Sequence, residues 1–115
     1  MNDEFDLSEV IPNLISFRRA RNWEQFHKPK DLAIALSIES SELLDLLLWL
    51  RDDEIKESIE KNIITDQIEE EIADIAIYLL YFSLDHKINL KKAILDKIEK
   101  NDKKYPVEKF RGKAR

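Results

Sequence analysis

The chain has 115 residues, of which 43% are apolar and 37% are charged, and its formal net charge at pH 7 is -5. Its three Pro and single Gly provide little of the turn punctuation that β-strands need, so an all-α fold is expected. The absence of Cys excludes disulfides and thiolate chemistry, and no run is long and apolar enough to cross a bilayer.

The charge is distributed unevenly along the chain. Residues 1–90 carry 20 acidic and 9 basic side chains, whereas residues 91–115 carry 4 acidic and 10 basic ones. A uniformly basic nucleic-acid binder does not have this distribution, so no nucleic-acid partner is expected. The N-terminus, Met1-Asn2-Asp3-Glu4, has a net negative charge and lacks the basic and apolar regions of a signal peptide, so we expect a cytoplasmic protein that does not associate with membranes.

Hydrophobic periodicity predicts four main helices and one short helix in a single domain that spans residues 1–115. The first helix runs from about Asp6 or Ser8 to Asn22, where Pro12 is tolerated only if it lies in the first turn. The second helix begins at Pro29, the position in a helix that Pro favours, and runs to about Arg51.

The remaining elements follow a charged stretch at residues 52–62, which predicts a short surface helix or a loop. The third long helix runs from about Asp66 to Asp85 or His86, and Thr65 or Asp66 is the expected cap. The fourth runs from about Asn89 to Lys104, because a residue that precedes Pro, here Tyr105, disfavours the helical conformation. Residues 107–115 are expected to form a basic C-terminal tail.

The second half of the second helix, Leu43 to Leu50, is interrupted only by Asp45 and is apolar on nearly every side. Such a helix must be covered on several sides, and a chain of this length has few other elements to cover it. We therefore expect a homodimer or a homotetramer.

Two pairs of carboxylates lie three residues apart within predicted helices, Glu39-x-x-Glu42 and Glu71-x-x-Asp74. This spacing places both members of a pair on one face of a helix, where like charges repel each other. The same pattern occurs at Glu54, Glu57 and Glu60, but there neighbouring lysines and water solvate it. The two pairs on the apolar helices need a compensating cation or raised pKa values.

Facing carboxylate pairs on bundle helices are a known way to build a metal site. Neither His27 nor His86 has the Glu-x-x-His spacing of a di-iron site. An all-oxygen ligand set suits Mg²⁺ or Mn²⁺, and Mg²⁺ often shares its coordination with substrate phosphates. The simpler interpretation is that these carboxylates are part of a solvated acidic surface.

The two pairs, separated by 28 residues, resemble the metal signature of the MazG-like all-α nucleoside triphosphate pyrophosphohydrolases. The flanking sequence is closest to the dCTP pyrophosphatase branch of that family. The matching segments are Arg21-Asn22-Trp23-Glu24-Gln25-Phe26-His27, Trp49 seven residues after Glu42, the run Glu71 to Leu79, and Asn101 with Lys104-Tyr105-Pro106.

The resemblance implies hydrolysis of a nucleoside triphosphate, such as dCTP or a modified pyrimidine deoxynucleotide, to the monophosphate and pyrophosphate. Glu39, Glu42, Glu71 and Asp74 would bind Mg²⁺, and Glu39 or Glu42 would be the general base. The pocket for base and sugar would consist of Trp23, Glu24, Gln25, Phe26, His27, Trp49 and Tyr78.

A basic stripe on the fourth helix is a candidate contact for the triphosphate, because its members are three or four residues apart. It comprises Lys97, Asn101 and Lys104, followed by Tyr105. A solvated helix face would have the same spacing. Similarly, Trp49 could be a core or interface aromatic, and His27 could cap the second helix.

One position departs from the pattern of the dCTP pyrophosphatase branch, whose members often have a His nine residues before the pocket Trp. Leu14 occupies that position here, so the preferred base remains open. The alternatives are dUTP, a purine or oxidised nucleotide, phosphoribosyl-ATP, and a non-catalytic helical interaction module.

Overall fold

A computed structural model describes residues 3–113, and in this range it contains helices and no β-strand. The chain divides into two compact units, one that ends at Phe82 and one that begins at Ser83. The all-α prediction is therefore confirmed. The α-helices are α1 (Val10–Ala20), α2 (Pro29–Leu47), α3 (Asp52–Glu60), α4 (Thr65–Asp85), α5 (Leu90–Lys104) and α6 (Val107–Phe110).

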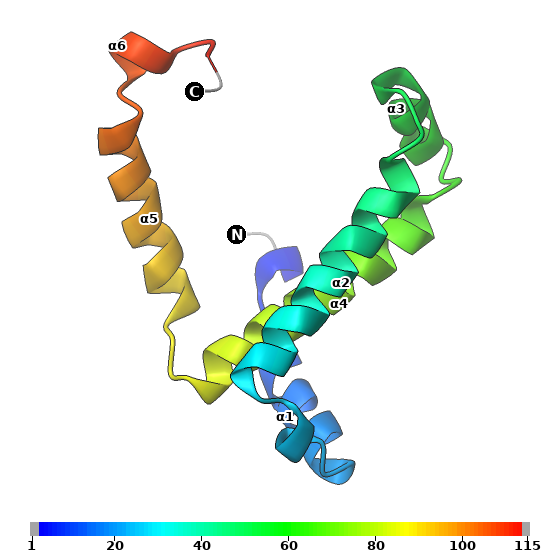
Figure 1. Ribbon diagram of the computed structural model, residues 1–115, viewed down its shortest axis with the longest axis vertical. Helices are drawn as coiled ribbons and strands as arrows, with labels where there is room; N and C mark the ends of the chain where they lie inside the picture. The colour runs from blue at the N-terminus through cyan, green and yellow to red at the C-terminus, as the bar shows by residue number, and fades with distance from the viewer. Residues whose placement is uncertain (1–2, 114–115) are drawn as a thin grey trace. The chain divides into compact units, whose positions relative to one another are not determined.

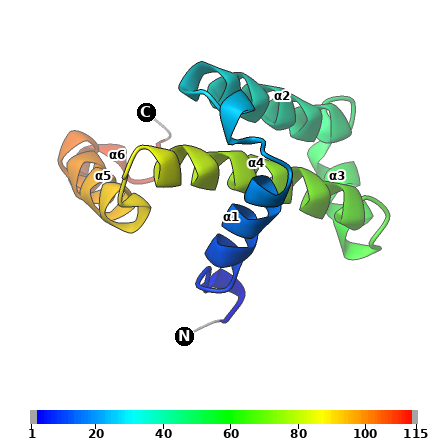
Figure 2. The ribbon, with the colours of Figure 1, turned by 90° about the horizontal axis from the view of Figure 1, so that it is seen from below.

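The first unit is built on α2 and α4, which run antiparallel beside each other and are connected by the short helix α3 (Figures 1 and 2). The carboxylates of Glu39 and Glu42 on α2 approach that of Glu71 on α4, which places the two helices in direct contact. This hairpin brings together two carboxylate pairs that are about 30 residues apart in the sequence.

Helix α1 crosses α4 on a side of α4 that α2 does not cover, as Figure 2 shows. The hydroxyl of Tyr81 on α4 donates a hydrogen bond of 2.8 Å to the backbone carbonyl of Leu14 on α1. A short 3-10 helix, η2 (Glu24–Phe26), links α1 to α2. This link therefore lies where α1 ends and α2 begins, next to the face that α1 presents to α4.

The helix starts follow from local rules. Pro12 is the third residue of α1, within the first turn, and Pro29 is the first residue of α2. Asn89 caps α5, because its side chain accepts a hydrogen bond from the backbone N–H of Lys92. Thr65 starts α4 rather than preceding it, and its hydroxyl donates to the carbonyl of Ile59.

Some helix bounds differ from the predictions, and α1 is shorter than predicted at both ends. Helix α2 ends at Leu47, four residues before the predicted end at Arg51, and a turn follows. The segment predicted as a tail contains α6, which begins directly after Pro106. Residues 114 and 115 of that tail lie outside the described residues.

The apolar core of the described residues is small. Leu32, Leu80 and Tyr81 are its buried aliphatic and aromatic side chains, with exposed fractions of 2%, 8% and 3%. Many large apolar side chains are exposed on α2, at its end and on α5, among them Ile34, Ile38, Leu44, Leu48, Trp49, Ile94, Leu95 and Ile98. None of the helices in residues 3–113 is both long and apolar enough to span a bilayer.

Candidate metal and nucleotide site

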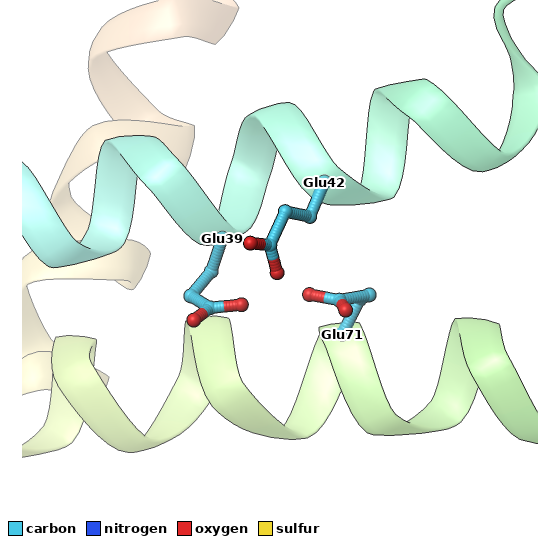
Figure 3. Close-up of side chains that lie close together, drawn as sticks. All are labelled: Glu39, Glu42 and Glu71. Atoms are coloured by element: carbon cyan, nitrogen blue, oxygen red, sulfur yellow. The ribbon is translucent and has the colours of Figure 1, made fainter.

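Three carboxylates form a cluster between α2 and α4, with Glu39 and Glu42 pointing from one helix toward Glu71 on the other (Figure 3). One oxygen from each residue lies within 4.8 Å of the other two. Ligand oxygens around an octahedral Mg²⁺ are about 3 Å apart when adjacent and about 4.2 Å apart when opposite, so small shifts of these side chains would allow all three to bind one ion.

The cluster contains polar atoms that the protein itself does not satisfy. The Oε2 atoms of Glu39 and Glu71 are buried, and neither has a hydrogen-bond partner within the described part of the chain. A buried acceptor without a partner costs about 1–3 kcal/mol. A bound cation would satisfy both oxygens at once, and it would also neutralise the repulsion between the carboxylates.

The ionisation of Glu39 is shifted by the neighbouring carboxyl groups of the cluster. A hydrogen bond shared with Glu71, burial, and the hydrogen bond and charge of Glu42 raise the pKa of Glu39 to about 7, with a smaller contribution from the charge of Asp74. Two carboxyl groups can share a hydrogen bond only if one of them is protonated. Without a cation, Glu39 therefore keeps its proton to a higher pH than an ordinary glutamate does.

These observations fit a divalent metal site. The three glutamates supply only oxygen ligands, which hard cations such as Mg²⁺ and Mn²⁺ prefer. The residues that would hold the ion are Glu39, Glu42 and Glu71, with Asp74 one helical turn after Glu71.

Asp74 connects the carboxylate cluster to a cavity. Burial and the charge of Glu39 raise the pKa of Tyr78, and the charge of Asp74 contributes least to this shift, as it does to that of Glu39. Both Asp74 and Tyr78 line the cavity. The cluster and the cavity therefore adjoin each other along α4.

The cavity has a volume of about 690 Å³ and lies between α1, the residues around η2 and α4. Its size falls within the range of about 300–1,000 Å³ that small-molecule sites usually have. Its walls are mainly apolar and aromatic, with a few polar groups. The lining residues include Leu14, Phe17, Trp23, His27, Asp74, Tyr78 and Tyr81.

Of the predicted pocket residues, Trp23, His27 and Tyr78 line this cavity. The ring of Trp23 meets that of Phe17 edge to face, with 5.7 Å between their centroids. Leu14, at the position where relatives often have a His, also lies on the wall. The cavity therefore offers one indole ring, one imidazole ring and two phenol rings to a ligand.

Other predicted pocket residues lie elsewhere in the first unit. Glu24, Gln25 and Phe26 form η2, where all three are exposed and the side-chain amide of Gln25 donates to the carbonyl of Asn22. Trp49 lies in the turn after α2 and is 88% exposed. In this chain Trp49 thus contributes to a surface rather than to the wall of the cavity.

The predicted phosphate contacts belong to the second unit. Lys97, Asn101 and Lys104 lie on α5, and Asn101 is the half-buried member of the three. Tyr105 follows the end of that helix, and the ammonium group of Lys104 lies 5.3 Å from the centre of its ring. Their contact with a triphosphate stays a prediction.

Tyr81 is a cavity residue that the sequence analysis did not identify. It follows Asp74 by seven residues and Tyr78 by three, so the three side chains share one face of α4. That spacing was visible in the sequence. The apolar residues around Tyr81 made it indistinguishable from an ordinary core residue.

Comparisons with known proteins agree with this geometry. Residues 34–114 match the model of the MazG-like family. The bovine protein (Bos taurus) named dCTP pyrophosphatase 1 is 37% identical over 98 residues, which cover 85% of this chain, and the human (Homo sapiens) one is 33% identical over 99 residues, which cover 86%. The chain spans 58% of the length of each of these relatives.

A crystallised pyrophosphatase from Archaeoglobus fulgidus DSM 4304 is 42% identical to the chain and superimposes on it with a TM-score of 0.81. The superposition covers 87% of this chain and 92% of the archaeal one. The family match includes all four predicted metal ligands, and the superposition extends the likeness to the arrangement of the helices. The resemblance seen in the sequence is thus confirmed, and the chain belongs to the MazG-like family.

Proposed function

We propose that this protein is a divalent-metal-dependent pyrophosphohydrolase that converts a nucleoside triphosphate and water to the monophosphate and pyrophosphate. The observation that carries the proposal is the position of Asp74, which lies on the cavity wall one helical turn after Glu71 of the carboxylate cluster. A nucleoside in the cavity would therefore have its phosphates beside the carboxylate cluster. The relatives named as pyrophosphatases support the same reaction.

The chain's own residues suit this reaction. Trp23 and Tyr78 offer aromatic faces against which a base can pack. Glu39, Glu42 and Glu71 would hold the cation, with Asp74 beside the cavity, and one carboxylate of the Glu39–Glu42 pair would accept the proton of the attacking water. When bound, Mg²⁺ neutralises phosphate charge and makes water a stronger acid.

The proposed substrate is dCTP or a modified pyrimidine deoxynucleotide, since the relatives above carry the name dCTP pyrophosphatase 1. Hydrolysis of such a nucleotide would remove it from the precursor pool. Leu14 contributes an apolar surface to the cavity, so polar contacts with the base fall to other lining residues, among them Asn13, His27 and Tyr78. The proposed location is the cytoplasm, and no nucleic-acid partner is proposed.

Pyrophosphate release from a panel of triphosphates tests the proposal. The panel should contain dCTP, 5-methyl-dCTP, dUTP, a purine deoxynucleotide, an oxidised purine nucleotide and phosphoribosyl-ATP, each with and without Mg²⁺ or Mn²⁺. We expect metal-dependent release that is fastest with a cytosine nucleotide. Faster release from another member would correct the substrate, and release from none of them would favour a non-catalytic interaction module.

We also propose that the chain assembles as a homodimer or homotetramer. The exposed apolar side chains at the end of α2 support this, because Leu44, Leu48 and Trp49 expose 55%, 49% and 88% of their surfaces. Covering a leucine or isoleucine side chain completely contributes roughly 1.5–3 kcal/mol. A second copy of the chain would bury this end of the helix.

Light scattering after size-exclusion chromatography tests the assembly. The wild type should elute as a dimer or a tetramer, and the double variant Leu44→Glu/Leu48→Glu should shift toward the monomer. Gln67→Glu is the matched control, since it adds a charge at an exposed polar position of α4 and should not change the mass. A monomeric wild type at micromolar concentration would contradict the proposal.

A further inference from the structure

Helix α1 offers one polar side chain to the cavity, that of Asn13. The other α1 residues on this wall are the apolar Val10, Leu14 and Phe17. Asn13 lies three residues after Val10 and four before Phe17, so it belongs to the stripe of α1 that faces the cavity. Its side chain is exposed and is therefore accessible to a ligand.

A hydrogen bond fixes the orientation of the Asn13 amide. Its Nδ2 atom donates to the backbone carbonyl of Glu9 at 3.0 Å. A carbonyl oxygen only accepts, so the atom beside it must be the amino nitrogen of the amide and not Oδ1. Turning the amide over would bring two acceptors together and break this bond. Oδ1 itself accepts no hydrogen bond from any group in residues 3–113, so its full capacity is left for a ligand.

The contact between α1 and α4 lies at the end of the cavity away from the carboxylate cluster. The cavity residues of α4 extend from Ala73 to Tyr81, about 12 Å along the helix axis, and Glu71 of the cluster precedes the first of them. Leu14, the neighbour of Asn13, accepts the hydrogen bond of Tyr81 at the far end. A nucleotide with its phosphates beside the cluster would therefore extend its base toward α1.

We propose that Asn13 selects a base with an exocyclic amino group over one with an oxo group at the same position. Oδ1 would accept from the N4 amino group of cytosine, and the second N–H of Nδ2 would donate to the adjacent N3. The ligand in this inference rests on the proposed function, while the orientation of the amide rests on the geometry alone.

The fixed amide is the reason for the selectivity. Uracil in the same position presents O4 and N3–H where cytosine presents its amino group and N3, so acceptor would meet acceptor and donor would meet donor. A freely rotating asparagine would turn its amide over and serve both bases. Asn13 would lose its hydrogen bond to Glu9 by doing so, and the oxo base is therefore bound less tightly.

The affinities of two hydrolysis-resistant nucleotides test the selectivity. The probes are the α,β-imido analogues of dCTP and dUTP, in which nitrogen replaces the bridging oxygen whose bond is broken when pyrophosphate is released. In calorimetric titrations with Mg²⁺, the wild type should bind the dCTP analogue roughly three- to tenfold more tightly, as expected for one hydrogen bond. Equal affinities, tighter binding of the dUTP analogue, or binding of neither would overturn the proposal.

Variants then attribute the preference to Asn13. The variant Asn13→Leu has a side chain of similar size without polar atoms, so the two analogues should bind with nearly equal affinity. Ser16→Ala is the matched control, because Ser16 is an exposed polar residue of α1 that does not line the cavity, and it should keep the wild-type preference. Circular dichroism checks the fold, and Asn13→Ala replaces Asn13→Leu if the latter does not fold. A wild-type preference in the folded variant would overturn the role of Asn13.

Pyrophosphate release distinguishes this inference from the proposed function. If the wild type prefers the dCTP analogue but releases no pyrophosphate from dCTP, the proposed reaction fails and the role of Asn13 stands. If it releases pyrophosphate from dCTP and dUTP at equal rates and binds the two analogues equally, the reaction stands and the role of Asn13 fails.

Discussion

Replacing Glu71 by Gln is expected to reduce metal-dependent pyrophosphate release at least roughly a hundredfold, because several kcal/mol of charge stabilisation depend on the bound cation. Glu71 supplies the α4 side of the carboxylate cluster, and its Oε2 is one of the two buried oxygens without a hydrogen-bond partner. The variant Glu71→Gln retains the shape of the side chain and loses its charge. Rates measured with saturating nucleotide and Mg²⁺ would show the effect.

The same variant should remain folded without the cation. Glu71 contributes most to the raised pKa of Glu39, so its replacement should bring the pKa of Glu39 closer to its ordinary value. Urea unfolding without metal should show a free energy of unfolding equal to or above that of the wild type, since a like charge is removed. Thus a loss of activity could not be attributed to unfolding.

Glu70→Gln is the control for this experiment. Glu70 is the exposed neighbour of Glu71 on α4, so the two variants change the net charge of the same helix by the same amount. We expect Glu70→Gln to keep nearly full activity. If Glu71→Gln kept it as well, the carboxylate cluster would not be the metal site of the reaction.

The second large effect is expected on thermal stability. At a free Mg²⁺ concentration a hundredfold above its dissociation constant, binding to the folded chain adds about 2.7 kcal/mol. For a chain of this size the melting temperature should rise by an amount on the order of 10 °C. Differential scanning fluorimetry with increasing Mg²⁺ or Mn²⁺ measures this shift, and no shift with either ion would contradict the metal site.

The shift should depend on pH in a definite direction. The folded metal-free chain keeps a proton on Glu39 up to about pH 7, while the unfolded chain releases it near the ordinary value of 4.5. The folded state binds more protons within that interval, so the free energy of unfolding of the metal-free protein should fall as the pH rises from about 4.5 to 7. Mg²⁺ requires ionised carboxylates, so its stabilising effect should grow over the same interval.

The variant Glu39→Gln tests whether the pH dependence and the Mg²⁺ shift both come from Glu39. It should remove the contribution of Glu39 to the pH dependence of the metal-free protein, and it should strongly reduce the shift caused by Mg²⁺. Glu69→Gln, at an exposed position of α4, should preserve both. A wild-type shift that stays constant between pH 5 and pH 8 would show that Mg²⁺ does not compete with protons at this cluster.

Much of the secondary structure could be predicted because helix signals are local. Pro29 marks the start of α2, Asn89 caps α5, and apolar periodicity extends over each long helix. The end of α2 was predicted too late, at Arg51 instead of Leu47, because the apolar run through Leu50 continues past the last helical turn. Apolar residues in a turn have the same pattern as residues inside a helix.

The candidate site could be predicted only in part. The spacing within each carboxylate pair follows from the helix period, so Glu39 and Glu42 were expected on one face. The spacing could not show which aromatic residues share the cavity with Asp74. Trp49 matched a family motif as well as Trp23 did, yet Trp23 lines the cavity and Trp49 is exposed in this chain.

The sequence by itself determined that the chain is helical, which residues form the long helices, and which carboxylates occur in pairs. These properties depend on hydrogen bonds and side-chain spacings within one or two turns of a helix. Only the tertiary structure decided that Glu71 faces Glu39 across two helices, that Asp74 borders a cavity, and that Arg18 lies against His27 and Tyr81. Contacts between residues far apart in the sequence depend on how the helices pack, and helical periodicity does not specify that packing.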